Sequence, residues 1–126
     1  MGSKGTATQA EVEEFLSIFK SCWDGNVVPR LNVNNDETLA ILGIKPKHRA
    51  EEIRLLRFDD YYKGPSPDHD GNPDKLWWAF GRWVDGYEIY IKICVYRGND
   101  GTYRAKCMSF HIPDRPLSYP LRKKGD

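Results

Sequence analysis

The fold is decided by residues 76–111, which read LWWAFGRWVDGYEIYIKICVYRGNDGTYRAKCMSFH. Apolar side chains recur there at every second position, a pattern typical of strands that bury one face. Two turn signals divide the stretch: Asp85-Gly86 is typical of a two-residue type I′ hairpin, and Gly98-Asn99-Asp100-Gly101 fits a four-residue loop. We therefore expect three antiparallel strands, over residues 76–84, 87–97 and 102–111.

The two turns also set a register for the expected sheet. The first places Phe80 opposite Ile91, and the second, with Arg97 facing Thr102, places Ile91 opposite Met108. One face then collects the residues expected to form the core: Leu76, Trp78, Phe80, Ile89, Ile91, Ile93, Val95, Met108 and Phe110. The other face collects Trp77, Ala79, Gly81, Trp83, Glu88, Tyr90, Lys92, Cys94, Cys107, Ser109 and His111.

On this second face, small residues surround side chains that carry chemistry. Lys92 is expected between Ala79 and Cys107, and His111 opposite Glu88 and diagonal to Tyr90, close enough for their side chains to meet. We therefore expect a shallow polar pocket with an acid–base residue, a cation and a phenol. Two structural alternatives stay open: the histidine can serve only to hydrogen-bond the C-terminal tail, and the lysine can be an ordinary solvated one.

Helical periodicity precedes the strands. A capping-box pattern at Thr8 opens an amphipathic stretch that Gly25 ends. A second helix is expected over residues 35–42, with Asn34 or Asn35 as its cap. Helices followed by an antiparallel meander predict an α+β domain, with N-terminal helices packed on a C-terminal antiparallel sheet.

The remaining segments complete this organisation. Pro46 is well placed to open a third helix, because proline is favoured in the first turn. Residues 63–75 hold three prolines and two glycines, which predicts a long irregular loop. We expect residues 1–7 to be a flexible tail and residues 8–126 to form a single domain.

Composition excludes several classes of protein. The chain has 126 residues, 40% of them hydrophobic, which suits one globular domain and is too apolar for a disordered chain. No apolar run approaches the roughly 18 residues that a spanning helix needs. The N-terminus lacks the apolar segment of a secretory signal, and the three cysteines form no CxxC pair, so a cytoplasmic protein is expected.

Charge and motifs narrow the chemistry further. The formal net charge is +1, but residues 1–62 carry −2 and residues 63–126 carry +3, which weakly favours a polyanion on the C-terminal half. The sequence has no glycine-rich phosphate loop, no serine–histidine–aspartate spacing and no cluster of metal ligands. Neither a cofactor nor a metal is expected.

The order of these strings resembles a known family. The chain is similar to type II toxin–antitoxin toxins of the RelE/ParE superfamily, most closely the ParE-like and motility quorum-sensing regulator (MqsR) toxins. The resemblance covers residues 12 to 119. In chain order, the matching features are a first helix ending in Gly25-Asn26-Val27, then Asn35 to Leu42-Gly43, Ile53 and Leu56, FDDYYKGPSPD at 58–68, a strand entered through Trp77 or Trp78, GYEIYIKICV at 86–95 and CMSFH at 107–111.

The resemblance implies a RelE/ParE-like fold, a bacterial cytoplasm, and a metal-independent endoribonuclease that cuts mRNA and is inhibited by a cognate antitoxin protein. By position, Lys63 and Tyr90 match residues important for cleavage in that family, and Lys92 lies in the same motif. His111 stands where those toxins carry a lysine. Because histidine exchanges protons near neutral pH and lysine mostly supplies charge, the division of roles is expected to differ here.

For this function, we expect His111 to act as general acid or base, with Tyr90 as its partner or as a hydrogen-bond donor to phosphate. Lys92 and Lys63 would neutralise charge on the reacting phosphate. The residues expected to hold RNA on either side are Arg104, Arg115, Arg122, Trp77 and Trp83. Among these, the expected register puts Arg104 on the core side of its strand.

Two other functions stay open. Some RelE/ParE-type toxins are not nucleases and act by binding a protein, for example by inhibiting DNA gyrase; exposed helix faces would then carry the activity. A degenerate or regulatory protein could also keep the fold and only its antitoxin-binding surface. Fold alone does not choose among these functions.

Overall fold

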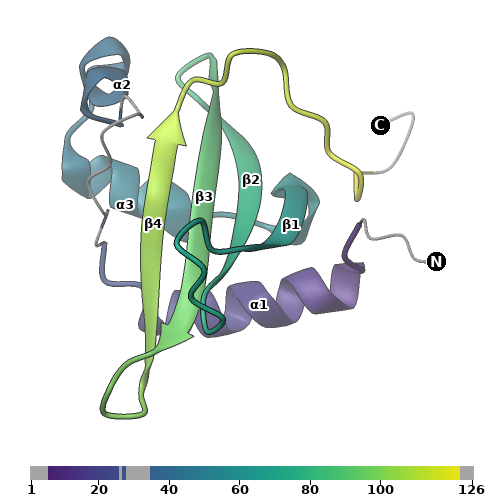
Figure 1. Ribbon diagram of the computed structural model, residues 1–126. Helices are drawn as coiled ribbons and strands as arrows, with labels where there is room; N and C mark the ends of the chain where they lie inside the picture. The colour runs from purple at the N-terminus through teal and green to yellow at the C-terminus, as the bar shows by residue number, and fades with distance from the viewer. Residues whose placement is uncertain (1–5, 26, 28–34, 123–126) are drawn as a thin grey trace.

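The computed structural model describes residues 6–25, 27 and 35–122 (Figure 1). In chain order the elements are α1 (Gln9–Cys22), α2 (Asn35–Leu42), α3 (Pro46–Arg54), a 3-10 helix (Phe58–Asp60), β1 (Tyr61–Pro67), β2 (Leu76–Val84), β3 (Tyr87–Arg97) and β4 (Tyr103–His111). The strands form one antiparallel sheet in the order β1-β2-β3-β4. The predicted α+β class is confirmed. No helix within the described ranges is long and apolar enough to cross a membrane.

The helices pack on one face of the sheet (Figure 1), where α1 contacts β3 and β4, and α2 contacts β4. The core between them is built from apolar side chains of all three helices and of β2, β3 and β4. Its buried members include Val12, Leu16, Phe19, Leu39, Ile53, Phe80, Ile89, Ile91, Ile93 and Phe110. We call the opposite face of the sheet the outer face.

The helix starts follow from their sequences. The Thr8 hydroxyl accepts a hydrogen bond from the N–H of Glu11, whose carboxylate accepts one from the N–H of Thr8, so the predicted capping box is confirmed. Pro46 occupies the first turn of α3, as predicted. Residues 1–5 of the expected tail lie outside the described residues. Ala7 is buried, and its N–H donates to the Tyr61 hydroxyl, so the packed domain begins before Thr8.

The first hairpin is confirmed residue by residue. β2 and β3 have the predicted bounds, and Val84 faces Tyr87, so that Phe80 pairs with Ile91. Asp85 and Gly86 both adopt positive φ, +50° and +87°, as a type I′ turn requires. This turn makes the register between β2 and β3 readable from sequence.

The second hairpin differs from the prediction by one residue. Arg97 faces Tyr103 rather than Thr102. Gly98 donates its N–H to Thr102 O and accepts from the N–H of Gly101, which has φ +83°. A glycine in the left-handed region closes a three-residue loop with a bulge, so the four-residue loop was the wrong choice.

A β-bulge then shifts the register between β3 and β4 again. Ile93 pairs with Cys107 and Lys92 with Ser109, which leaves Met108 as the extra residue on β4. Asn35 is the first residue of α2 and not its cap: its side chain bonds to the backbone of Met108 and Phe110 on the outer edge of β4.

These two one-residue shifts correct three assignments. Between the loop and the bulge every β4 side chain is on the face opposite to the one predicted. Cys107 is therefore buried in the core, while Met108 packs with Trp77 and Cys94 on the outer face. Arg104 pairs with Tyr96 and lies on the outer face, not on the core side. Beyond the bulge the two shifts add to an even number, so Ser109, Phe110 and His111 point as predicted.

The segment 63–75 is not wholly a loop, because residues 61–67 form edge strand β1 against β2. Its register is irregular between Tyr61 and Lys63 and again between Lys63 and Ser66, where Pro65 lies. Pro67 pairs with Leu76 at the strand end, and an edge strand tolerates both prolines because it does not need every N–H. Gly64 has φ +117°, and a Cβ there would lie 2.7 Å from Trp77 O. The prolines therefore made this segment look like a loop, although an edge strand can contain them because its outer edge has no neighbouring strand.

Candidate functional site

Two neighbouring rows of paired residues cross the outer face at the His111 end of the sheet. One row consists of Gly81, Tyr90 and His111 on β2, β3 and β4. The next consists of Lys63, Ala79, Lys92 and Ser109 on β1, β2, β3 and β4. Residues two apart on a strand share a face, so the structure brings all four expected catalytic residues onto adjacent rows.

Tyr90 and His111 face each other directly across β3 and β4, with ring centroids 5.4 Å apart. This pairing is closer than the diagonal contact expected from sequence. The Tyr62 ring packs edge-on against Tyr90 at 6.3 Å from its other side. Burial, with a smaller contribution from Tyr62, raises the pKa of the Tyr90 phenol. Tyr90 therefore remains protonated at neutral pH and can donate a hydrogen bond but cannot act as a base.

The backbone orients the His111 ring. Its Nδ1 lies 3.2 Å from Ile112 O, and a carbonyl oxygen can only accept. The hydrogen bond therefore requires a proton on Nδ1, which in the neutral imidazole leaves Nε2 as an acceptor. His111 is half-buried at the end of β4, next to the segment that leaves the sheet.

Lys63 and Lys92 flank Ala79 from β1 and β3. Strands lie about 4.8 Å apart, so the two lysine backbones are separated by roughly 10 Å across the small alanine. The Lys63 ammonium is 5.4 Å from the Tyr62 ring centroid, and the Lys92 ammonium 6.0 Å from that of Trp77. Both lysines thus lie in the row next to the Tyr90–His111 pair, with the Lys63 ammonium near Tyr62 and the Lys92 ammonium directed toward Trp77.

Glu88 does not pair with His111 as predicted. Its carboxylate accepts hydrogen bonds from the N–H of Leu117 at 3.1 Å and from the Tyr119 hydroxyl at 2.6 Å. The C-terminal segment therefore crosses the outer face above Gly81, where a Cβ would collide with the side chains of Tyr119 and Leu117. Figure 1 shows this segment leaving the end of β4 and passing across the sheet. The C-terminal segment thus forms one boundary of the polar group around Tyr90.

The two tryptophans expected to stack on bases differ in exposure. Trp77 is only 4% exposed, because it packs against Cys94 and Met108 and donates its Nε1–H to Asp68. It is therefore not available for stacking on a base, contrary to the prediction. Trp83, at the hairpin end of β2, is 57% exposed and remains available.

The three arginines expected to bind RNA also differ. Arg115 is exposed in the C-terminal segment, and Arg104 is exposed on the outer face beside Asp100 at 3.4 Å. Arg122 is bound within the protein: its guanidinium lies 3.2 Å from the Asp60 carboxylate and 3.9 Å from the Tyr119 ring centroid. Its charge is largely compensated there, so it is the weakest phosphate ligand of the three.

Sequence reasoning missed three residues of this face. Tyr62 precedes the segment expected to be a loop and was assigned to no strand, so its contact with Tyr90 was not foreseen. Lys75 and Lys106 both approach Tyr96, and the shifted hairpin register hid the second of them. If Gly101 is taken as the left-handed residue that closes a three-residue loop, the alternation along β4 places Lys106 on the outer face.

Among residues 6–25, 27 and 35–122, no group of three or more histidine, cysteine, aspartate or glutamate side chains is arranged to hold a metal ion. Comparisons with protein-family models, curated proteins and solved structures find no match to this chain. The geometry of the outer face and the sequence resemblance are therefore the two indications of function.

Proposed function

We propose that this protein is an RNA-cleaving toxin of the RelE/ParE type that acts without a metal ion, and that it cleaves on the outer face of the sheet. The observation that carries the proposal is the direct pairing of Tyr90 with His111, at 5.4 Å between ring centroids, beside the row that holds Lys63 and Lys92. The group supplies a proton acceptor, a neutral hydrogen-bond donor and two cations on one surface.

RNA carries its own nucleophile, the 2′-OH, so the protein must move protons and stabilise charge. In the proposed reaction, Nε2 of His111 accepts the proton of the 2′-OH as its oxygen attacks the adjacent phosphorus. The Tyr90 phenol donates a hydrogen bond to a nonbridging phosphate oxygen, and the two ammonium groups stabilise the charge of the phosphorane. The bond between phosphorus and the 5′-oxygen then breaks, the leaving oxygen takes a proton from solvent water, and His111 returns the proton it accepted to solvent. The products carry a 2′,3′-cyclic phosphate and a 5′-hydroxyl.

The biological setting of the proposal rests on the sequence resemblance. It implies mRNA as substrate, translation inhibition as outcome, a bacterial cytoplasm as location and a cognate antitoxin protein as inhibitor. The surface chemistry is compatible with a polyanion, since Lys63, Lys92 and Arg104 share the outer face.

The test is incubation of the purified protein with a defined RNA in EDTA, followed by mapping of the cleavage ends. We expect cleavage in EDTA and cyclic phosphate ends that a phosphatase removes only after acid opening. A His111→Ala protein purified in parallel controls for contaminating nuclease. Activity that requires Mg²⁺, or equal activity in both preparations, contradicts the proposal and leaves a protein-binding toxin as the interpretation to test.

A further inference from the structure

A second group of cations lies at the opposite end of the outer face, around Tyr96 of β3. The Lys75 ammonium is 5.1 Å from the Tyr96 ring centroid, and the Lys106 ammonium is 5.0 Å from it. Lys75 immediately precedes β2 and Lys106 lies on β4, so cations from both sides converge on one ring of the central strand. Arg104 pairs directly with Tyr96 in the register.

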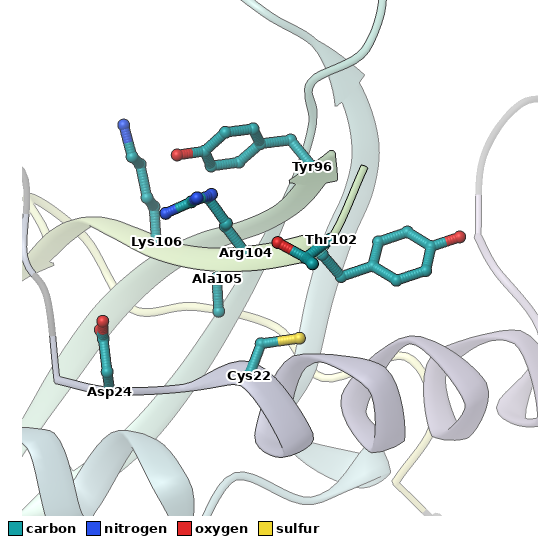
Figure 2. Close-up of a pocket in the computed structure, with 8 residues that line it drawn as sticks. Cys22, Asp24, Tyr96, Thr102, Arg104, Ala105 and Lys106 are labelled. Carbon is teal, nitrogen blue, oxygen red and sulfur yellow. The ribbon is translucent and has the colours of Figure 1, made fainter. Parts of the chain in front are cut away.

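This group borders a cavity of about 400 Å³ between the segment before β2 and the β3–β4 hairpin. Lys75, Arg97 and Arg104 line it together with the Tyr96 ring, and Asp74 is the one carboxylate among its described lining residues. Figure 2, drawn at a neighbouring cavity along β4, shows Tyr96, Arg104 and Lys106 together on one side of the strand, with Ala105 turned to the other side toward Cys22.

The arrangement brings three cations close to one ring, and one of them is paired: the Asp100 carboxylate lies 3.4 Å from the Arg104 guanidinium. The distances to the shared ring place the two ammonium nitrogens no more than about 10 Å apart, near the Debye length of roughly 8 Å at physiological salt. The ring's negative face offsets part of their repulsion and holds both side chains in place. An anion bound beside the ring, in contact with either ammonium group, would offset the rest of the repulsion.

We propose that Lys75, Tyr96, Arg104 and Lys106 form a second subsite, which binds backbone phosphates of single-stranded RNA away from the cleavage site. The identity of the ligand rests on the proposed function. Both subsites lie on the outer face of β3, six residues apart from Tyr90 to Tyr96, which is about 20 Å at 3.3 Å per residue. A stacked strand rises about 3.4 Å per nucleotide, so the subsite lies at most about six nucleotides from the scissile phosphate.

The experiment measures binding separately from cleavage. Dissociation constants for a fluorescent, fully 2′-O-methylated 12-nucleotide RNA, which cannot be cleaved, are determined by anisotropy at several salt concentrations. Three proteins are compared: wild type, Lys75→Gln/Lys106→Gln, and the control Lys45→Gln/Lys47→Gln, whose exposed lysines belong to the start of α3. Thermal melting confirms that all three are folded.

Each phosphate contact with a single strand contributes about 0.7 to the slope of log affinity against log salt. We therefore expect the magnitude of the slope to be about 1.4 smaller in the Lys75→Gln/Lys106→Gln protein than in wild type. Its affinity at 0.1 M salt should be lower by at least about tenfold. The control should match wild type. An unchanged slope, or an equal loss in the control, overturns the subsite.

The outcomes also separate this inference from the proposed function. If the salt slopes of wild type and of the Lys75→Gln/Lys106→Gln protein differ as expected but wild type does not cleave unmodified RNA, the subsite stands and the catalytic proposal fails. If wild type cleaves and the variant has the wild-type slope, the catalytic proposal stands and the subsite fails. Where both hold, the variant should cleave with raised KM and a kcat close to that of wild type, because the cluster contacts RNA away from the reacting phosphate.

Discussion

The side-chain carbonyl of Asn35 accepts a hydrogen bond of 2.9 Å from the backbone N–H of Phe110. The amide nitrogen of the same side chain donates to Met108 O at 3.0 Å. Asn35 thus bonds the outer edge of β4 at the bulge residue itself and two residues beyond it, and satisfies backbone groups that an edge strand leaves open. Since the bulge sets which face His111 occupies, a residue at the start of α2 holds the candidate site in register.

Replacing this side chain should loosen both the bulge and the site. Asn35→Ala leaves two backbone groups without these hydrogen bonds, and each buried unsatisfied group costs about 1–3 kcal/mol. We expect the free energy of unfolding to fall by about 2–4 kcal/mol and amide exchange at Phe110 to accelerate. Urea denaturation and hydrogen exchange measure the two effects. An alanine variant as stable as wild type would show that the bulge does not depend on Asn35.

The three cysteines should react very differently. Burial raises the pKa of Cys94 and of Cys107 to about 12, whereas Cys22 is half-buried near the end of α1. Because the thiolate is the reactive form, we expect a disulfide reagent at pH 8 to modify one thiol quickly in the native protein and the other two only on unfolding. Cys22→Ser should abolish the fast phase. A fast phase that persists in this variant contradicts the burial of the other thiols.

The C-terminal segment should detach when Glu88 is removed. Burial and then the Glu88 carboxylate raise the pKa of Tyr119, so its hydroxyl stays protonated and donates to Glu88. A hydrogen bond to a charged group contributes about 1.5–3 kcal/mol. We expect chymotrypsin to cleave after Leu117, which Ser118 follows, faster in Tyr119→Phe than in wild type, and fastest in Glu88→Ala, which loses both contacts. Equal cleavage rates in all three would show that other contacts hold the segment.

Asp60 should make the protein less stable as pH rises. Burial is the main cause that raises the pKa of its carboxyl; the Arg57 N–H and the Arg122 guanidinium oppose it. The folded state therefore binds this proton more tightly, and the contribution of Asp60 to the free energy of unfolding falls as pH rises from about 4 through the folded pKa. Asp60→Asn should gain stability relative to wild type between pH 4 and 7 in urea titrations. A relative loss over that range means that the Arg122 ion pair dominates.

The parts of the fold that sequence predicted are those with local signals. Asp85-Gly86 permits one turn geometry, so the β2–β3 register followed from it. The β3–β4 register did not, because Gly101 allows a three-residue loop as well as a four-residue one, and the bulge at Met108 is fixed by Asn35, far away in the chain. Both errors shift the strand by one residue. They add to two beyond the bulge, which is why Ser109 and His111 were placed on the correct face.

Coverage of the sheet was harder to predict than its register. Alternation placed Trp77 on the outer face correctly, but the loop that brings Asp68 to its indole N–H buries it. Leu76 was expected in the core and is 46% exposed, since it lies at the strand end. Alternation predicts the direction of a side chain; the segments that cover a face depend on contacts that no short motif records.

His111 provides the sharpest test of the candidate site. Losing a general base typically lowers the rate by roughly 10²–10⁴. Because the ring is half-buried at a strand end, we expect His111→Ala to lose cleavage by that factor while its melting temperature stays within a few degrees of wild type. A purely structural histidine would give the reverse: a lower melting temperature and near-normal specific activity in the folded fraction.

Two further variants separate proton transfer from charge and from hydrogen bonding. His111→Lys introduces a protonated amine, which has no free electron pair to accept a proton, so the variant should be inactive if Nε2 accepts the 2′-OH proton. Tyr90→Phe removes only a hydroxyl that the raised pKa keeps protonated, so it should cost less than His111→Ala and leave the pH dependence of kcat unchanged. Cleavage rates between pH 5.5 and 8.5 for all four proteins make the comparison. An active His111→Lys protein would mean that this position supplies positive charge, and the base would then have to be sought elsewhere on the outer face.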